Sequence, residues 1–131
     1  MSNLLADDLN YILDHTATLW DDVRGQRLFI TGGTGFVGRW LLESFVWANA
    51  RLDLGASAIV LTRHPDTFQR MAPHLAFDPA IKLQIGDVTT FKAPNGTFSH
   101  VIHAAADMGA RKGKQGALRL FQSIVHGTER I

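Results

Sequence analysis

The sequence predicts an α/β fold, in which helices cover both faces of a parallel sheet. Short apolar runs alternate along the chain with longer segments of helical periodicity. One of these runs, residues 58–62, is apolar almost throughout, as in a strand that is covered on both faces. A glycine-rich turn, residues 32–38, joins the first run to the next helical segment. Right-handed crossovers between such strands predict the strand order 3-2-1-4.

A helical segment precedes this alternating pattern. From residue 3 to about residue 22, apolar side chains recur at three- and four-residue steps, which predicts a helix. Asn3 is its candidate N-cap, and Gly25 ends the segment. We therefore expect residues 1–24 to form a helical extension that packs on the outside of the domain or on a partner. Residues 25–131 are expected to form the α/β domain itself.

Four short segments have the pattern of strands. The first and second are largely apolar, whereas the third alternates apolar and polar residues. A turn at residues 94–96 precedes the fourth. The predicted strands are 27–31, 58–62, 81–85 and 100–105.

The helices between and after these strands are predicted from their apolar periodicity. Pro65 fits the first turn of the second helix, and Pro73 ends it. Residues 109–116 are expected to form a polar loop. The predicted helices are 37–50, 66–71 and 118–131. The buried side of the first is predicted at Val37, Trp40, Leu41, Phe45, Ala48 and Leu52. The apolar side of the last is predicted at Leu118, Phe121, Ile124, Val125 and Ile131.

Composition excludes several classes of protein. The 131-residue chain has the length of one domain, and its net charge of +1 gives no reason to expect nucleic acid as a partner. Its apolar runs are shorter than the roughly 18 residues that span a bilayer. The first residues lack the basic region and apolar stretch of a signal peptide. The absence of cysteine excludes disulfides and thiolate metal sites. We expect a cytoplasmic protein with no membrane partner.

The glycine-rich turn carries the clearest functional signal. Gly33, Gly35 and Gly38 fit G-x-G-x-x-G, and Gly32 gives a second register, T-G-x-x-G-x-x-G, that begins at Thr31. Between a strand and a helix, such glycines permit a tight turn, close backbone approach to a pyrophosphate and close packing of the helix. The pyrophosphate would sit at the positive end of the helix. The alternative is a glycine-rich turn without a ligand.

In the second register, the segment resembles the extended short-chain dehydrogenase/reductase superfamily, and within it the NAD-dependent epimerase/dehydratase family. The resemblance covers residues 25–131 and implies a Rossmann-type domain that binds NAD(P). It also implies that backbone N–H groups of the turn hold the pyrophosphate, while Gly38 serves helix–strand packing. The residues that would offer those groups are Gly32, Thr34, Gly35, Phe36 and Val37.

The end of the second predicted strand bears on the choice of nucleotide. A carboxylate there would bind the ribose 2′-hydroxyl of NAD, but the chain has Arg63 near this position. A guanidinium can bind a phosphate with two hydrogen bonds, so Arg63 favours NADP through its 2′-phosphate. The stretch also resembles that of NADP-dependent reductases of the superfamily. Two alternatives stay open: Arg63 is a solvated loop residue, or Asp66 serves NAD.

Two further stretches match the family. Asp87 and Val88 follow the third predicted strand, where the resemblance implies an acceptor for the adenine amine and an apolar wall for the ring. Ala104, Ala105 and Ala106 end the fourth, where small side chains would leave room for the ribose and phosphates. The alternatives are an aspartate that caps a turn and a tightly packed strand end.

No catalytic or metal-binding set is predicted in the chain. The family uses a tyrosine as general acid/base with a lysine four residues later, but the single tyrosine here, Tyr11, is followed at that spacing by His15. Ile124 stands where many members have an asparagine that supports the lysine. His100 and His103 are three residues apart and face opposite sides of a strand, so no metal site is expected.

The resemblance runs to the end of the chain, at Ile131, and matches only the front part of a family member. It implies an epimerase, dehydratase or reductase that transfers a hydride, acting on a nucleotide-sugar. We expect a Rossmann-type sheet truncated after the fourth strand and its helix, inactive by itself. Its fourth strand would have an unpaired edge, which predicts self-association there or by exchange of the final helix. The alternative is a non-catalytic NAD(P)-binding or redox-sensing module.

Overall fold

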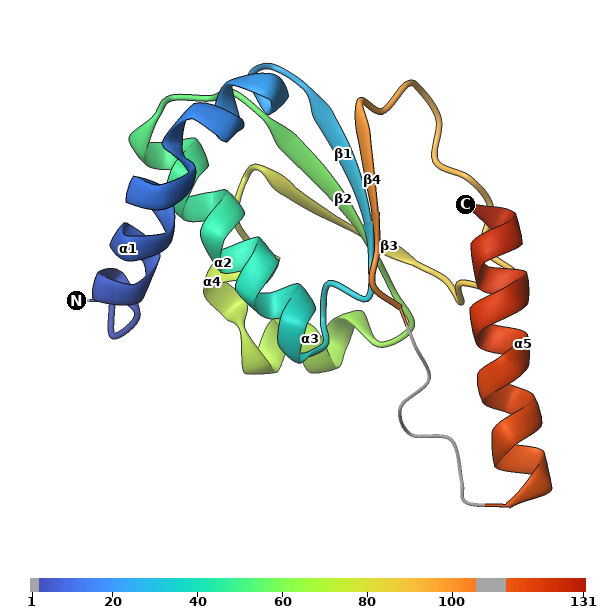
Figure 1. Cartoon of the computed structure of the whole chain (residues 1–131). Helices are drawn as coiled ribbons and strands as arrows, with labels where there is room; N and C mark the ends of the chain where they lie inside the picture. The colour runs from blue at the N-terminus through green and yellow to red at the C-terminus, as the bar shows by residue number, and fades with distance from the viewer. Residues whose placement is uncertain (1–2, 106–112) are drawn as a thin grey trace.

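The computed structural model describes residues 3–105 and 113–131 and contains one sheet of four parallel strands (Figure 1). The strand order is β3-β2-β1-β4, which confirms the predicted α/β Rossmann-type topology. The last strand is shorter than predicted: it ends at His103, and the next N–H groups bond to the carbonyl and hydroxyl oxygens of Thr31. The strands are β1 Arg27–Thr31, β2 Ser57–Thr62, β3 Ile81–Ile85 and β4 His100–His103.

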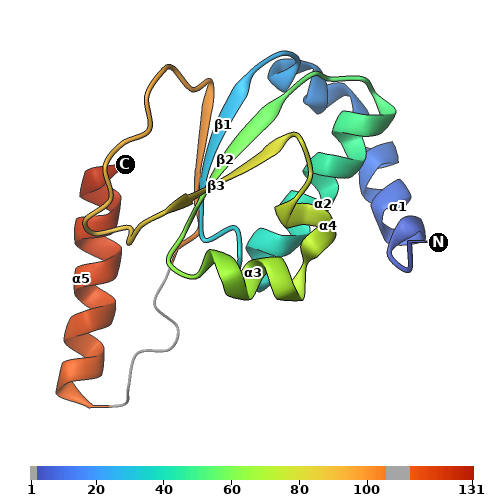
Figure 2. The same ribbon diagram turned by 180° about the vertical axis from the view of Figure 1, so that it is seen from behind.

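Helices lie on both sides of this sheet, as predicted (Figures 1 and 2). One side carries α2 Phe36–Arg51, α3 Pro65–Met71 and the short α4 Pro73–Ala76. The other side carries α5 Lys114–Arg130. Pro73 ends α3 as expected, but it also occupies the first turn of α4, which the sequence pattern did not predict.

The hydrophobic core is divided by the sheet into two unequal parts. Alternate residues of each strand point to opposite faces, so Leu28 and Ile30 face the larger cluster, while Phe29 faces the smaller. The larger cluster includes Leu42 and Phe45 of α2, both almost fully buried. The smaller cluster consists of Phe29, Ile59, Leu61, Val88 and Phe91, with Phe98 and Ala105 packed against it.

The N-terminal segment is helical, but it is not one continuous α-helix as predicted. α1 spans Ala6–Thr16, and a 3₁₀ helix, η1, follows over Ala17–Val23. The Thr16 hydroxyl donates to the Ile12 carbonyl at 2.7 Å, a local bond that competes with continuation of the α-helix. The buried Leu9 and a hydrogen bond from Trp47 Nε1 to Asn10 Oδ1 (3.0 Å) attach α1 to the outside of α2.

The buried side of α2 differs from the prediction at its start. Val37 was predicted to be buried, but it is 61% exposed, because the inward side begins one residue later at Gly38 and continues through Leu42 and Phe45. Leu42, absent from the predicted set, is fully buried.

The final helix also differs from the prediction. It starts at Lys114, inside the predicted loop 109–116. Its predicted apolar side is largely exposed, since Leu118, Phe121 and Ile124 have exposed fractions of 55%, 60% and 48%. Within the described residues, no helix has both the length and the apolar character that crossing a bilayer requires.

Candidate functional site

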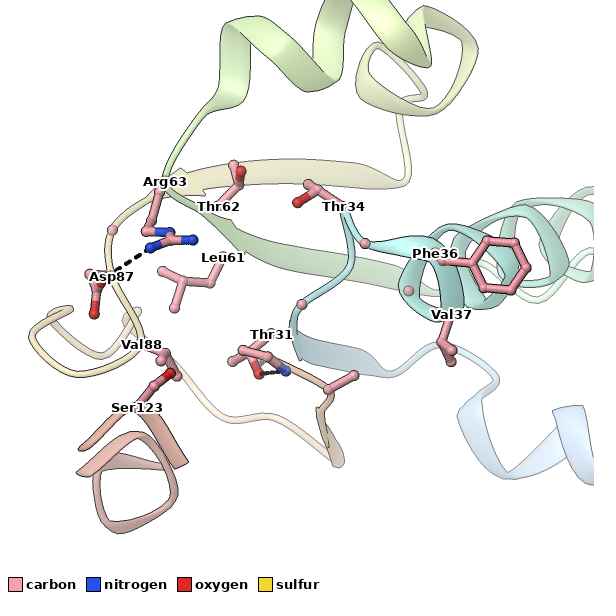
Figure 3. Close-up of a pocket in the computed structure, with 16 residues that line it drawn as sticks. Thr31, Thr34, Phe36, Val37, Leu61, Thr62, Arg63, Asp87, Val88 and Ser123 are labelled. Carbon is pink, nitrogen blue, oxygen red and sulfur yellow. Dashed lines mark hydrogen bonds and ion pairs between the residues drawn. The ribbon is translucent and has the colours of Figure 1, made fainter. Parts of the chain in front are cut away.

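A pocket of about 580 Å³ opens at the carboxyl ends of the four strands (Figure 3). This is the edge at which parallel α/β sheets bind ligands, and the volume suits a small molecule. Every predicted site residue within the described part of the chain lines the pocket; Ala106 is not among the described residues. The lining residues are Thr31, Gly32, Thr34, Gly35, Phe36, Val37, Gly38, Leu61, Thr62, Arg63, Gly86, Asp87, Val88, Ala104, Ala105 and Ser123.

Two glycines of the turn stand where no side chain fits. Gly32 has φ +72°, and a Cβ on it would overlap the carbonyl group of Ala104. A Cβ on Gly38 would overlap the carbonyl oxygen of Gly32. The missing side chains let the turn lie directly against the end of β4 and let α2 pack against the turn.

The start of α2 presents backbone donors to the pocket. The helix begins at Phe36 after Gly35, and no side chain in the part of the chain that the structure describes caps it. The N–H groups of its first turn, at Phe36, Val37 and Gly38, have no acceptor within the helix and carry the positive end of its dipole. The Phe36 side chain is 81% exposed and points away from the pocket, so its backbone is what faces the space (Figure 3). This end of the pocket can hold an anion.

Thr31 ties the ends of β1 and β4 together beneath the pocket. It is fully buried, and its hydroxyl lies 2.6 Å from His103 Nδ1 while accepting from the Ala105 N–H at 3.3 Å. The hydroxyl has one proton to donate and lone pairs to accept, so it can serve both partners. His103 therefore contacts the pocket through Thr31, whereas His100, three residues earlier on the same strand, is exposed.

At the opposite end of the pocket, a cation faces an anion. Arg63 follows β2 and Asp87 follows β3, and the Arg63 guanidinium lies 3.8 Å from Asp87 Oδ2 (Figure 3). That distance exceeds a hydrogen bond, and both side chains are about half exposed. The pair is therefore weak, and the guanidinium is available to a stronger anion.

Asp87 is ionised, and within the described residues its Oδ2 accepts no hydrogen bond and makes only the weak pair with Arg63. Its Oδ1 accepts from the Thr89 hydroxyl at 2.5 Å and from the Thr89 N–H at 2.8 Å, so the predicted alternative of a turn-capping aspartate is realised. These bonds, with a smaller contribution from Arg63, hold the pKa of Asp87 below its usual value. Oδ2 remains able to accept a bond from a ligand.

Apolar side chains make the wall next to this pair. Val88 and Leu61 belong to the smaller core cluster and also line the pocket, and Ala105 packs against the same cluster. A flat ring could lie against this wall while its polar edge reaches Asp87. The arrangement combines a donor-rich end, an apolar wall and a cation in one space.

Sequence reasoning missed five residues that line the pocket. Of these, Thr31 was visible as the first residue of the glycine motif, and Ser123 stands next to Ile124 on α5. Ile124 itself, at the asparagine position of the family, is 48% exposed. Tyr11 lies outside the pocket on α1 and is 65% exposed. The five missed residues are Thr31, Leu61, Thr62, Gly86 and Ser123.

Comparison with known proteins gives the family. The family model of the NAD dependent epimerase/dehydratase family matches residues 28–131, which is most of the chain. The chain therefore belongs to that family, as its motifs predicted, and the family as a whole binds NAD(P). Neither a curated protein nor a solved structure matched the chain.

Proposed function

We propose that this member of the NAD dependent epimerase/dehydratase family binds NADP, with the 2′-phosphate on Arg63 and the pyrophosphate on the glycine turn. The observation that carries the proposal is the position of Arg63, which lines the same pocket as the uncapped start of α2 and lies at its other end. A dinucleotide has anionic groups at separate positions, and the pocket offers the backbone N–H donors of the α2 start at one and the Arg63 guanidinium at the other.

The preference for NADP over NAD rests on charge. Among residues 3–105 and 113–131, the Arg63 guanidinium is held only by the 3.8 Å approach to Asp87, so a phosphate dianion would attract it more strongly. With NAD, the guanidinium would gain only a neutral hydroxyl. Asp66 lies in the first turn of α3 and is not among the pocket-lining residues, which disfavours it as a ribose ligand.

The adenine would lie between Val88 and Leu61, with its exocyclic amine toward Asp87 Oδ2. In the described part of the chain that oxygen accepts no hydrogen bond, because the Thr89 bonds use Oδ1. The depressed pKa keeps the acceptor ionised at neutral pH. Ala104 and Ala105 would leave room for the ribose.

The reaction that we propose is hydride transfer in an epimerase, dehydratase or reductase that acts on a nucleotide-sugar. The nicotinamide of the bound nucleotide would accept the hydride or donate it. The role of this chain is to hold the nucleotide. A second candidate is a binding or redox-sensing module, because the residues that line the pocket could hold a nucleotide without taking part in a reaction.

Calorimetric titration with NADP⁺ and NAD⁺ tests the nucleotide site. We expect tighter binding of NADP⁺, and Arg63→Ala should weaken NADP⁺ binding by about 10–100-fold, the value of a charge-assisted hydrogen bond. NAD⁺ binding should change little. Arg70→Ala on α3 removes another exposed guanidinium, one that does not line the pocket, and serves as the matched control.

Other outcomes discriminate among the alternatives. Equal or tighter NAD⁺ binding would overturn the choice of NADP while leaving the pocket in place. If neither nucleotide binds to the folded chain, the proposed site is wrong. Hydride exchange between bound nucleotide and added nucleotide-sugars would favour the enzyme over the sensing module.

A further inference from the structure

Asp87 begins a short turn, residues 87–91, that follows β3 at the edge of the pocket. Its carbonyl oxygen accepts from the N–H groups of Thr90 (3.0 Å) and Phe91 (2.8 Å), which closes the turn. Its carboxylate oxygen Oδ1 accepts from the N–H and the hydroxyl of Thr89. The last torsion of an aspartate side chain is otherwise broad, so two bonds to one oxygen fix the direction of the other.

The turn is itself anchored from two sides. Phe91 is buried in the smaller core cluster, where its ring centre lies 5.5 Å from that of Phe29. From α5, Arg130 donates its Nε–H to the Thr89 carbonyl (2.8 Å) and its Nη1–H to the Phe91 carbonyl (3.2 Å). The turn therefore cannot shift without losing core packing or the bonds from α5. Support of this kind preorganises a binding group before its ligand arrives.

The fixed carboxylate presents one oxygen to the pocket. Asp87 Oδ2 faces Arg63, which leaves it on the pocket side of the turn (Figure 3). Val88 and Leu61 form the apolar wall next to it. A base that lies against this wall therefore meets a single acceptor in a set direction.

Such an acceptor can tell one purine from another. Adenine carries an amine at position 6, which donates, whereas a 6-oxopurine such as hypoxanthine carries an oxygen there, which accepts. The nearest donor of hypoxanthine is the N–H at the next ring position. A carboxylate that rotates freely could follow the donor to that position, but a carboxylate held in one orientation would face the oxygen. Rejection of the wrong base then comes from two acceptors placed together.

We propose that Thr89 makes the pocket selective for adenine over 6-oxopurines, by holding Asp87 so that only Oδ2 faces the base. Thr89 does not line the pocket, so it acts through Asp87 as a positioning residue. Without its hydroxyl, Asp87 would keep the bond from the Thr89 N–H alone, and the carboxylate could turn toward the donor of a 6-oxopurine. This inference rests on the proposed function, since it concerns the base of the nucleotide bound there.

Calorimetric titration of the 131-residue chain with NADP⁺ and with its deamino analogue, which carries hypoxanthine in place of adenine, tests the proposal. We expect NADP⁺ to bind about tenfold more tightly or better, the value of a hydrogen bond to a charged group. Thr89→Val, similar in size but without the hydroxyl, should reduce this ratio to about threefold or less. Thr89→Ser keeps a hydroxyl and should keep the ratio. Circular dichroism establishes that each variant remains folded.

Thr90→Val is the matched control, because it removes a neighbouring exposed hydroxyl that does not line the pocket. If Thr89 only supported the fold, Thr89→Val would weaken both nucleotides equally and leave their ratio unchanged. An unchanged ratio in Thr89→Val, or a ratio near one in the parent chain, overturns the inference while leaving the NADP site in place. If neither nucleotide binds to the folded parent chain, the proposed function fails and the inference fails with it.

Discussion

The two faces of the sheet are covered in different ways. On one face, α2 packs large side chains such as Leu42 and Phe45 into the larger core cluster. On the other, α5 approaches through Gly116 and Gly127 and leaves Phe121 exposed. The sequence predicts an apolar side for both helices, so apolar periodicity alone does not say which surface a helix covers. The α2 face stabilises the fold, whereas the α5 face combines part of the pocket wall with an open apolar surface.

The largest expected effect comes from equal truncations on the two faces. Leu42→Ala should lower the free energy of unfolding by about 2–5 kcal/mol, because Leu42 is fully buried. Leu118→Ala, at a 55% exposed residue, should change it by less than about 0.5 kcal/mol. Denaturant unfolding at concentrations too low for self-association measures both. Equal losses would show that the α5 face is as well packed as the α2 face.

A smaller effect is expected from loosening the end of α5. Arg130→Ala removes the bonds to the carbonyls of Thr89 and Phe91 and should cost about 1 kcal/mol. Amide hydrogen exchange should become faster in α5 and stay the same in α2. Arg119→Ala, at another exposed arginine of α5, is the control. If Arg130→Ala leaves exchange in α5 unchanged, the helix is held mainly by its glycine contacts.

The smallest expected effect is on the pH dependence of stability. It concerns Asp87, which precedes Val88 on the side of the sheet that α5 covers. Bonds from Thr89, then the Arg63 charge, lower the pKa of Asp87 in the folded state. Since an aspartate in an unfolded chain has a pKa of about 3.9, the unfolded chain binds the proton more readily in acid than the folded chain does. This stabilisation is complete above the unfolded pKa and is lost as pH falls through the folded pKa.

Asp87→Asn should therefore make stability less dependent on pH in the acid range. Acid unfolding curves of the variant and the parent chain measure the difference. Asp66→Asn, an exposed carboxylate on α3, is the matched control. Curves of equal steepness for parent and Asp87→Asn would contradict the assigned hydrogen bonds.

The strands were predictable because their signals are local. Alternation, continuous apolar runs and the glycine turn placed β1, β2 and β3 within one residue of their observed bounds. The break after α1 was not predictable from periodicity, since it coincides with a side-chain bond of Thr16. Periodicity also identified the apolar side of α5 but could not indicate that Gly127 would be the residue that contacts the sheet.

The pocket likewise contains some residues that local sequence motifs predict and others that only the assembled fold brings together. The glycine turn, Arg63 and Asp87 belong to short motifs next to strand ends. The sequence alone therefore predicts that they lie at one edge of the sheet. Thr31 acquires its role from His103, 72 residues away, and Ser123 from the packing angle of α5. Contacts of this kind depend on the assembled fold.

The pairing of β1 with β4 has a consequence for the order of folding. β1 pairs on one side with β2, for which Leu28 meets Ala58, and on the other with β4, for which it meets His100. During synthesis from the N-terminus, one edge of β1 therefore stays open until the fourth strand emerges. Pairings between distant segments also form slowly. We expect the nucleotide pocket, whose floor is the junction of these two strands, to be completed last, so a nascent chain would acquire its ligand only at the end of folding.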